Sequence, residues 1–348
     1  MSEKSPIINE WKKLFELMIK IKEIAPWEWL YEQDIFAVQN PKTNELGFVS
    51  VMGANGEHYA ISVYLGETGL HRFWDLQQIP IDVFAQQELI EMPHLQAVLE
   101  DRDLLDAKDR DLIKKTGFKF RGTHSWPMFR SHRPGFFPWY LEPDEMFFLQ
   151  CALDQTIDVA PRVKQDLSLL KPNDKQNYLL RKQVRKNDKF IWQDSILKVT
   201  SSPQIKLDCP QNKNAIKILK TTAPNAAASE IDLFMISKPV KEKGKRPFFP
   251  YALMILDADN GMIIENKLLQ PLPTLEALWG NIPYQVAEIF AKIQLRPKKI
   301  LVSNELLYQL LIRFTYDLNI SLKRIDVLPN ISLAREAMVE FFKQQGGL

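Results

Sequence analysis

The spacing of apolar and polar positions divides the chain into alternating helices and strands. Over residues 6–24, apolar side chains recur every three or four positions, which is the spacing of one face of an α-helix. Apolar runs follow at 34–40, 48–52 and 58–65, and an Asn-Gly pair at 55–56 is a strong hairpin signal. This part of the chain is therefore predicted to form a three-stranded antiparallel β-meander with flanking helices.

A second regular pattern covers residues 251–328. Two apolar runs, the second starting at Met262, flank a turn built from Asp, Asn and Gly, and together they predict a β-hairpin. The elements predicted after it are a helix over 283–295, a strand over 299–302, a helix over 305–318, a strand over 320–327 and a final helix over 332–344. This order indicates a mixed α/β layer whose later strands run parallel.

The stretch between these two patterns is basic and less regular. Over residues 171–189, Arg181 and Arg185 are spaced four apart, and so are the lysines that follow each of them. On a helix this spacing gives one basic face, so a helix is predicted here, with strands after it. A charged segment with Gly and Pro at 238–247 is predicted to be a linker.

The predicted fold class is α+β, with three regions in a chain of 348 residues. Residues 1–159 are predicted to form an acidic α+β domain around the meander. Residues 160–247 are predicted to be a basic middle region of helix and strands that ends in the linker. Residues 248–348 are predicted to form the α/β domain.

Composition excludes several classes of protein. With 45% hydrophobic and 11% aromatic residues the chain is typical of a well-cored globular protein. No stretch approaches the roughly 18 uninterrupted apolar residues of a membrane helix, and the start lacks the apolar region of a signal peptide. Two cysteines are too few for a disulfide framework or a tetrahedral zinc site. We therefore expect a soluble cytoplasmic protein with no membrane partner.

Charge is distributed unevenly although the net charge is only +2. Residues 1–159 carry 16 Lys and Arg against 25 Asp and Glu, whereas residues 160–250 carry 19 against 8. The remainder is balanced, with 10 of each. A basic region of this kind is typical of a nucleic-acid surface, but it is equally compatible with docking of the acidic and basic parts on each other.

The densest group of side chains capable of function lies at 118–142. Its candidate ligand- or partner-binding residues are Arg121, Arg130, His132, Arg133 and Trp139, to which Arg181 and Arg185 of the basic region are added. Basic groups interleaved with aromatic rings suit phosphate binding together with base stacking. The same residues also suit a buried crossover that packs its rings against the meander, so both interpretations stay open.

Metal and cofactor sites are not predicted. The aspartates at 101–111 do not follow the calcium-loop pattern, because Leu105 and Asp106 stand where an oxygen ligand and a glycine are required. His124 and His132 are eight residues apart with no cysteine nearby, which does not fit a zinc site. The glycines around the 55–56 turn lack the Lys and Ser or Thr of a phosphate loop.

The hairpin, helix, strand and helix over 251–318 resemble the ribonuclease H-like fold of nucleases. That resemblance implies a two-metal site in which Asp257 with Asp259, and either Glu276 or Glu288 on the helix, would supply carboxylates. After the strand at 299–302, however, the chain has Ser303 and an asparagine where the resemblance implies an acid. The loss of that charge indicates a catalytically silent layer of related shape.

A second resemblance covers more of the chain. The segments at 34–41, 47–53, 60–66, 134–139 and 253–258 are similar to those of a family of uncharacterised bacterial proteins, which are known only as domains of unknown function. The resemblance implies a bacterial protein and no established activity.

Two hypotheses of function follow. The first is a non-enzymatic binding or regulatory module that engages a protein or nucleic acid through residues 121–140 and the basic face at 181–186. The alternative is a metal-dependent enzyme acting on nucleic acid through Asp257 and Asp259 in the C-terminal domain.

Overall fold

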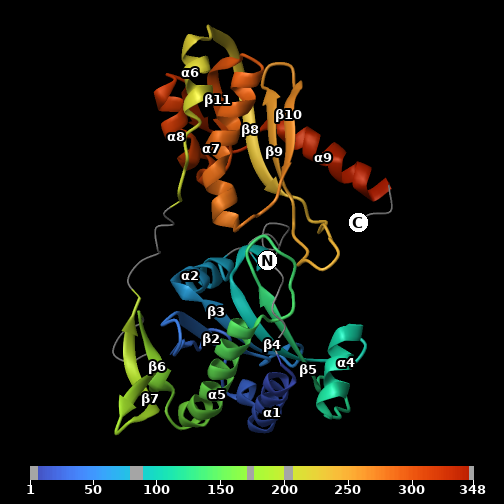
Figure 1. The fold of residues 1–348 in the computed structure, drawn as a ribbon, viewed down its shortest axis with the longest axis vertical. Helices are drawn as coiled ribbons and strands as arrows, with labels where there is room; N and C mark the ends of the chain where they lie inside the picture. Colours follow the sequence, from blue (N-terminus) through green and yellow to red (C-terminus); the bar gives the residue numbers. More distant parts are fainter. Residues whose placement is uncertain (1–6, 79–88, 171–175, 200–206, 345–348) are drawn as a thin grey trace. The chain divides into compact units, whose positions relative to one another are not determined.

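The computed structural model describes residues 7–78, 89–170, 176–199 and 207–344, and the chain folds into two compact units (Figure 1). The first unit comprises residues 1–133 and 138–204, and the second comprises residues 134–137 and 205–348. The region expected at 160–247 is therefore divided between them. Each unit has its own sheet with helices packed on it, which confirms the predicted α+β class.

The first unit is built on a seven-stranded sheet in the order β5-β4-β3-β2-β1-β6-β7. Its strands are β1 (Phe36–Gln39), β2 (Leu46–Met52), β3 (Tyr59–Leu65), β4 (His94–Glu100), β5 (Trp126–His132), β6 (Asn177–Lys186) and β7 (Lys189–Lys198). Neighbouring strands are antiparallel except β1 and β6, which are parallel. The predicted meander is confirmed as β1 to β3.

The helix predicted over residues 171–189 is wrong, because the described part of this stretch is the strand β6. It pairs with β7 without interruption over ten residue pairs, from Asn177 opposite Lys198 to Lys186 opposite Lys189. Between the strands, Asn187 and Asp188 both have positive φ, which is the conformation of a two-residue hairpin turn. The turn and the pairing with β1 outweigh the four-residue spacing of the basic side chains, so these arginines do not share a helix face.

Helices cover both faces of this sheet. On one face, α1 (Ile8–Ile24) and α5 (Pro143–Gln165) pack on each other and on alternate residues of the strands, such as Phe36 and Val38. On the other face, α2 (Gly66–Leu76) packs against Ala37 and its neighbours. The alternation within β1 follows from the two-residue repeat of a strand, which sends successive side chains to opposite faces.

The second unit has a five-stranded mixed sheet in the order β10-β9-β8-β11-β12. Its strands are β8 (Pro224–Met235), β9 (Tyr251–Asp257), β10 (Ile263–Leu269), β11 (Arg296–Val302) and β12 (Ser321–Arg324). The strands β8, β9 and β10 are antiparallel, whereas β8, β11 and β12 are parallel. The predicted hairpin and the parallel arrangement of the later strands are both confirmed.

Four helices accompany this sheet in the described residues, namely α6 (Lys213–Thr221), α7 (Leu275–Lys292), α8 (Glu305–Asp317) and α9 (Pro329–Gln344). Helix α9 packs against Ala252, Met254 and Leu256 of β9. Leu253 and Ile255 point to the opposite face and are also fully buried, so both faces of the sheet are covered.

No helix in the described ranges is both long enough and apolar enough to span a bilayer.

Candidate functional site

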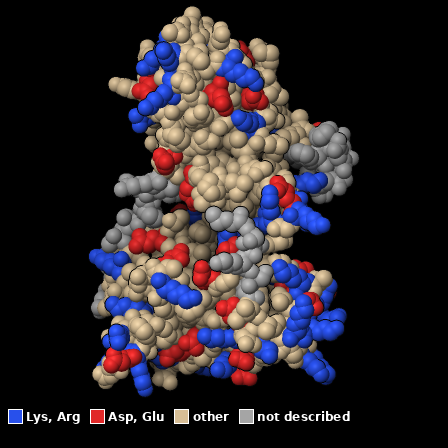
Figure 2. All heavy atoms as spheres, in the orientation of Figure 1, with Lys and Arg blue, Asp and Glu red and all other residues tan. Residues whose placement is uncertain are grey.

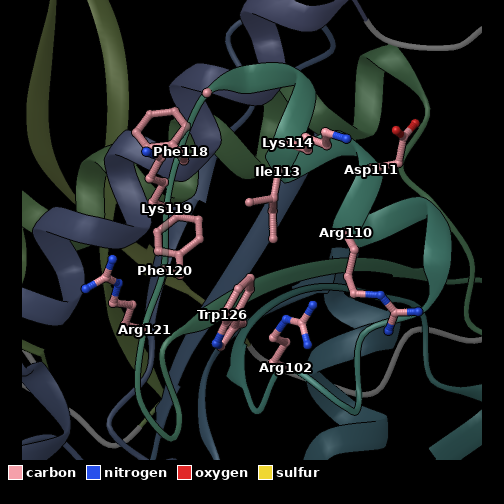
Figure 3. A pocket seen from close by; sticks show the side chains of 11 residues that line it. Arg102, Arg110, Asp111, Ile113, Lys114, Phe118, Lys119, Phe120, Arg121 and Trp126 are labelled. Atoms are coloured by element: carbon pink, nitrogen blue, oxygen red, sulfur yellow. The ribbon is translucent and has the colours of Figure 1, made fainter.

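A basic pocket lined with aromatic rings lies in the first unit, beside α4 (Ala107–Thr116) (Figure 3). Its volume is about 580 Å³, which is within the range of small-molecule sites. The lining comes from the turn after β4, from α4, from the segment after that helix and from the first residue of β5. The residues are Arg102, Arg110, Asp111, Ile113, Lys114, Gly117, Phe118, Lys119, Phe120, Arg121 and Trp126.

Local sequence explains how the wall on the α4 side forms. Asp106 caps the first turn of the helix by accepting hydrogen bonds from the backbone of Lys108 and Asp109. Because Arg110 and Lys114 are four residues apart, they lie on the same side of α4. Gly117 ends the helix in the left-handed conformation, with a φ of 84°, and thereby turns the chain into the extended segment that follows.

Aromatic rings form the opposite wall. Figure 3 shows Phe118, Phe120 and Trp126 following one another along this side, facing Ile113 and Arg110. The rings of Phe118 and Phe120 are nearly parallel, with centroids 5.9 Å apart and planes inclined by 8°. Trp126 meets Phe120 edge-on at 6.1 Å. All three rings are only partly buried, so the pocket has apolar surface on which a planar group can stack.

Five cations surround these rings. Among the described residues, none of Arg102, Arg110, Lys114, Lys119 and Arg121 forms an ion pair with a carboxylate. The one acid of the lining, Asp111, is instead paired with Lys115 at 2.6 Å. Lys and Arg also gather on the visible surface around the α4 end of the first unit (Figure 2). The five cations of the described lining outnumber its one acid, so the pocket is positively charged.

Two of the arginines are oriented by the pocket itself. The guanidinium carbon of Arg102 lies 5.7 Å from the centre of the Trp126 ring. Arg110 donates a hydrogen bond to the backbone carbonyl of Leu105. Both guanidinium groups keep further N–H donors for an anion, because each carries five. A phosphate or carboxylate with an attached planar ring is the chemistry that this arrangement suits.

Of the residues predicted from the sequence, Arg121 lines this pocket and Arg130 does not. Arg130 donates to Asp109 at 2.9 Å and 2.5 Å, and it also reaches Asp106 at 3.3 Å. Burial alone would lower the pKa of Arg130, but its hydrogen bonds and the charge of Asp109 outweigh this effect and raise it. Asp106 also accepts a hydrogen bond from the hydroxyl of Tyr140. Arg130 therefore joins β5 to the start of α4.

Three further arginines have acidic neighbours. Arg133 contacts Glu142 at 2.8 Å and Glu145 at 2.9 Å. Arg181 is buried, donates a hydrogen bond to Gln155 and pairs with Asp158 and Asp194. Arg185 is exposed and pairs with Asp188. Trp139 exchanges two backbone hydrogen bonds with Ser131, and its ring meets that of Tyr140 at 5.3 Å.

His132 stacks on His94, which lies directly opposite it on β4. The ring centroids are 3.8 Å apart and the planes differ by 16°. His94 is almost completely buried, and its Nδ1 is 2.9 Å from the carbonyl oxygen of Met92. Burial lowers the pKa of His94 to about 4, since the charged ring would lose its hydration.

We expect this histidine to make the protein less stable in acid. The unfolded chain binds a proton at His94 near pH 6.5, whereas the folded chain does not until about pH 4. Stability is therefore lost as the pH falls through this window, and about 2 kcal/mol should disappear between roughly pH 7 and pH 5. When measured by urea unfolding, the free energy of unfolding should differ less between the two pH values for His94→Gln than for the natural chain. The exposed His58 provides a control, and a His94→Gln chain with the pH dependence of His58→Gln would contradict this account.

The acids proposed for a metal site are in the second unit. Oδ1 of Asp257 accepts hydrogen bonds from the backbone N–H of Asp259 at 2.9 Å and of Asn260 at 3.1 Å, so it caps the hairpin turn. Glu276 is in the first turn of α7 and is half-buried. In the described ranges, no three His, Cys, Asp or Glu side chains are placed to hold a metal ion.

Two buried acids on β8 were missed by the sequence analysis. Glu230 accepts hydrogen bonds from the backbone of Asn330 at 3.4 Å and of Ile331 at 2.9 Å, so it caps the start of α9. Asp232 lies 3.4 Å from Arg335, and burial raises the pKa of its carboxyl group. The sequence did hold a signal for them, since Glu230 and Asp232 alternate with apolar residues in a stretch of strand-forming residues.

The fold and the pocket define a two-unit α+β protein with a basic, aromatic-lined cavity in the first unit. Residues 11–181 match the family described as "Domain of unknown function (DUF7309)", and residues 215–339 match the one described as "Domain of unknown function (DUF6930)". The chain thus carries two domains of unknown function, as its resemblance to uncharacterised proteins implied. Neither description names a ribonuclease H-like fold. No curated protein matches the chain.

Proposed function

We propose that this protein is a non-enzymatic binding module whose first unit binds a nucleotide, either free or within a single strand of nucleic acid. The observation that carries the proposal is the pocket at α4, in which five cations without carboxylate partners surround three partly exposed aromatic rings. A nucleotide offers both matching parts, because its phosphate is anionic and its base has a flat face for stacking. A volume of about 580 Å³ is suited to a single nucleotide.

The lining favours binding over chemistry. Asp111 is the one acid among the described lining residues, and it forms an ion pair with Lys115 within α4. Among the described lining residues there is no histidine, cysteine, serine or threonine to act as a base or a nucleophile. The cations and rings are the groups that would hold a ligand in place.

The test is a binding measurement with two probes, a free nucleoside diphosphate followed by calorimetry and a fluorescent single-stranded decanucleotide followed by anisotropy. Replacing Arg102 and Arg121 together with Gln is expected to weaken binding at least about ten-fold, because each loses a charge-assisted hydrogen bond. For the decanucleotide, the slope of log affinity against log salt should fall by about 0.7 for each phosphate that the variant no longer neutralises. Trp126→Leu should also weaken binding, because it removes a stacking face.

Arg185→Gln is the control, since it neutralises an exposed arginine on β6, which four strands separate from β5 beside the pocket. It should leave both affinities unchanged. Binding of the diphosphate alone would identify a free nucleotide as the ligand, and binding of the strand alone would identify nucleic acid. Absence of saturable binding for both probes, or a double variant that binds like the natural chain, would overturn the proposal.

A metal-dependent enzyme in the second unit is the other hypothesis. An antiparallel hairpin followed by parallel strands supports a layer of ribonuclease H-like shape. Its carboxylates support a silent layer, since Asp257 caps a turn, Glu230 caps a helix and Asp232 pairs with Arg335. Metal-dependent cleavage of DNA or RNA that Asp257→Asn abolishes would reverse this preference.

A further inference from the structure

The outer edge of β7 has the features of a peptide-docking surface. β7 is the last strand of the seven-stranded sheet and, among the described strands, pairs only with β6, so half of its backbone N–H and C=O groups have no ladder partner in the described residues. At ten residues it is longer than an average strand, and it contains neither a proline nor a bulge. Exposed edges are usually shortened, bent or interrupted to prevent pairing with another chain. This edge is left long and regular.

Exposed apolar side chains follow the same edge. Phe190 is 71% exposed, Ile191 is 41% exposed and Ile196 is 54% exposed. Because side chains alternate along a strand, Phe190 and Ile196 are on one face of the sheet and Ile191 is on the other. An added strand would therefore meet apolar surface on both faces, which is how strand addition gains affinity beyond its backbone hydrogen bonds.

The charges at the two ends of β7 define the occupant. Lys189 begins the strand and Lys198 ends it, and neither forms an ion pair with a described carboxylate. The acids of the hairpin are already used, since Asp188 pairs with Arg185 and Asp194 pairs with Arg181. A strand lying along β7 places a side chain beside each terminal lysine, where an acid is favourable and a base is not.

The same charges disfavour a second copy of this chain as the occupant. Two β7 strands paired antiparallel about their centre would bring Lys189 of one copy opposite Lys198 of the other, twice in each dimer. Like charges directly opposite each other destabilise a strand pair. A segment with acidic ends has no such conflict in either direction of pairing.

We infer that β7 docks an extended, acidic-ended peptide segment of a partner protein by strand addition, with an apolar, β-branched centre against Phe190, Ile191 and Ile196. The site is separate from the nucleotide pocket and does not depend on it.

The experiment uses the full chain and two fluorescent ten-residue peptides of alternating Val and Thr, one with Glu at both ends and one with Lys at both ends. The Glu-ended peptide should bind saturably, and the Lys-ended peptide about ten-fold more weakly. The double variant Lys189→Glu, Lys198→Glu should invert this preference. A second double variant, Phe190→Ser, Ile196→Ser, should weaken the binding of both peptides without unfolding the protein, because both side chains are exposed.

A charge-matched control is Lys12→Glu, Lys20→Glu on α1, which should keep the preference for the Glu-ended peptide. Equal binding of the two peptides, or binding of neither, would overturn the inference. A concentration-dependent dimer of the natural chain that Phe190→Ser, Ile196→Ser abolishes would assign the edge to a second copy. Displacement of the Glu-ended peptide by a single-stranded oligonucleotide at low salt, absent in the Lys189→Glu, Lys198→Glu chain, would assign it to nucleic acid.

Discussion

Replacing Phe15 with Ala is expected to lower the free energy of unfolding of the first unit by about 3–5 kcal/mol. Phe15 is 2% exposed, and its ring lies 5.6 Å from that of Phe118, 5.8 Å from that of Phe120 and 5.5 Å from that of Phe129. Removal of the ring takes away the packing partner of all three neighbours and leaves a cavity between α1 and the sheet. The loss of stability should therefore exceed that of an ordinary surface truncation several-fold.

Urea unfolding followed by far-ultraviolet circular dichroism measures this loss. Leu104→Ala is the matched control, because Leu104 is 64% exposed and its truncation should change stability by no more than about 0.5 kcal/mol. Phe118 and Phe120 also line the pocket beside α4, so Phe15→Ala should weaken the proposed nucleotide binding under conditions in which the protein is still folded. A loss of stability similar to that of Leu104→Ala would show that the ring does not support this wall.

Replacing Asp109 with Asn is expected to cost about 3–5 kcal/mol, because it leaves the charge of Arg130 largely buried with too little compensation. The side chains of both residues are mostly inaccessible to solvent, and the closest N–O distance between them is 2.5 Å. Asp106, the other acid near Arg130, is half-exposed and 3.3 Å away, so it compensates only in part.

A double-mutant cycle with Arg130→Met separates the pair from the individual residues. The double variant should be more stable than Asp109→Asn alone, since it removes the charge that the single variant leaves unpaired. Asp111→Asn is the control, because Asp111 is two residues further along α4 and is exposed. It should change the free energy of unfolding only slightly. Equal losses of stability for Asp109→Asn and Asp111→Asn would show that the pair contributes little.

Local signals were sufficient for most of the fold. The meander and the β9–β10 hairpin were predicted because turn residues such as Asn55, Gly56 and Gly261 stand between apolar runs of strand length. The helices α8 and α9 were predicted to within three residues at each end, whereas α7 begins at Leu275, eight residues before the predicted start, and continues through Pro283. Each of these signals acts within about ten residues and needs no knowledge of distant contacts.

The strand β6 was mispredicted because two local patterns compete in it. Its basic residues fit a helix face, but Asn187 and Asp188 mark a tight turn that pairs the stretch with β7. The pairing with β1 is non-local and does not show in the spacing. Tertiary pairing decides the outcome in such a segment.

The candidate site was predicted only in part for a similar reason. The sequence shows that Arg121, Arg130 and Arg133 are close together along the chain, but it does not show which of them meets an acid. Asp109 is 21 positions from Arg130, and the contact between them depends on how α4 packs. Arg102 and Arg110 were not among the candidates predicted from the sequence, whereas the fold directs both into a pocket where neither has a carboxylate partner among the described residues.

Residues 134–137 are assigned to the second unit although their neighbours on both sides are in the first. Within that unit, the backbone N–H of Phe249 donates a hydrogen bond to the carbonyl of Gly135 at 2.8 Å, and that of Phe137 donates one to the carbonyl of Pro247 at 2.9 Å. The polypeptide consequently leaves one unit for the other three times. No single cleavage point yields two complete pieces, and a fragment ending at residue 204 would take with it four residues to which the rest of the second unit is hydrogen-bonded.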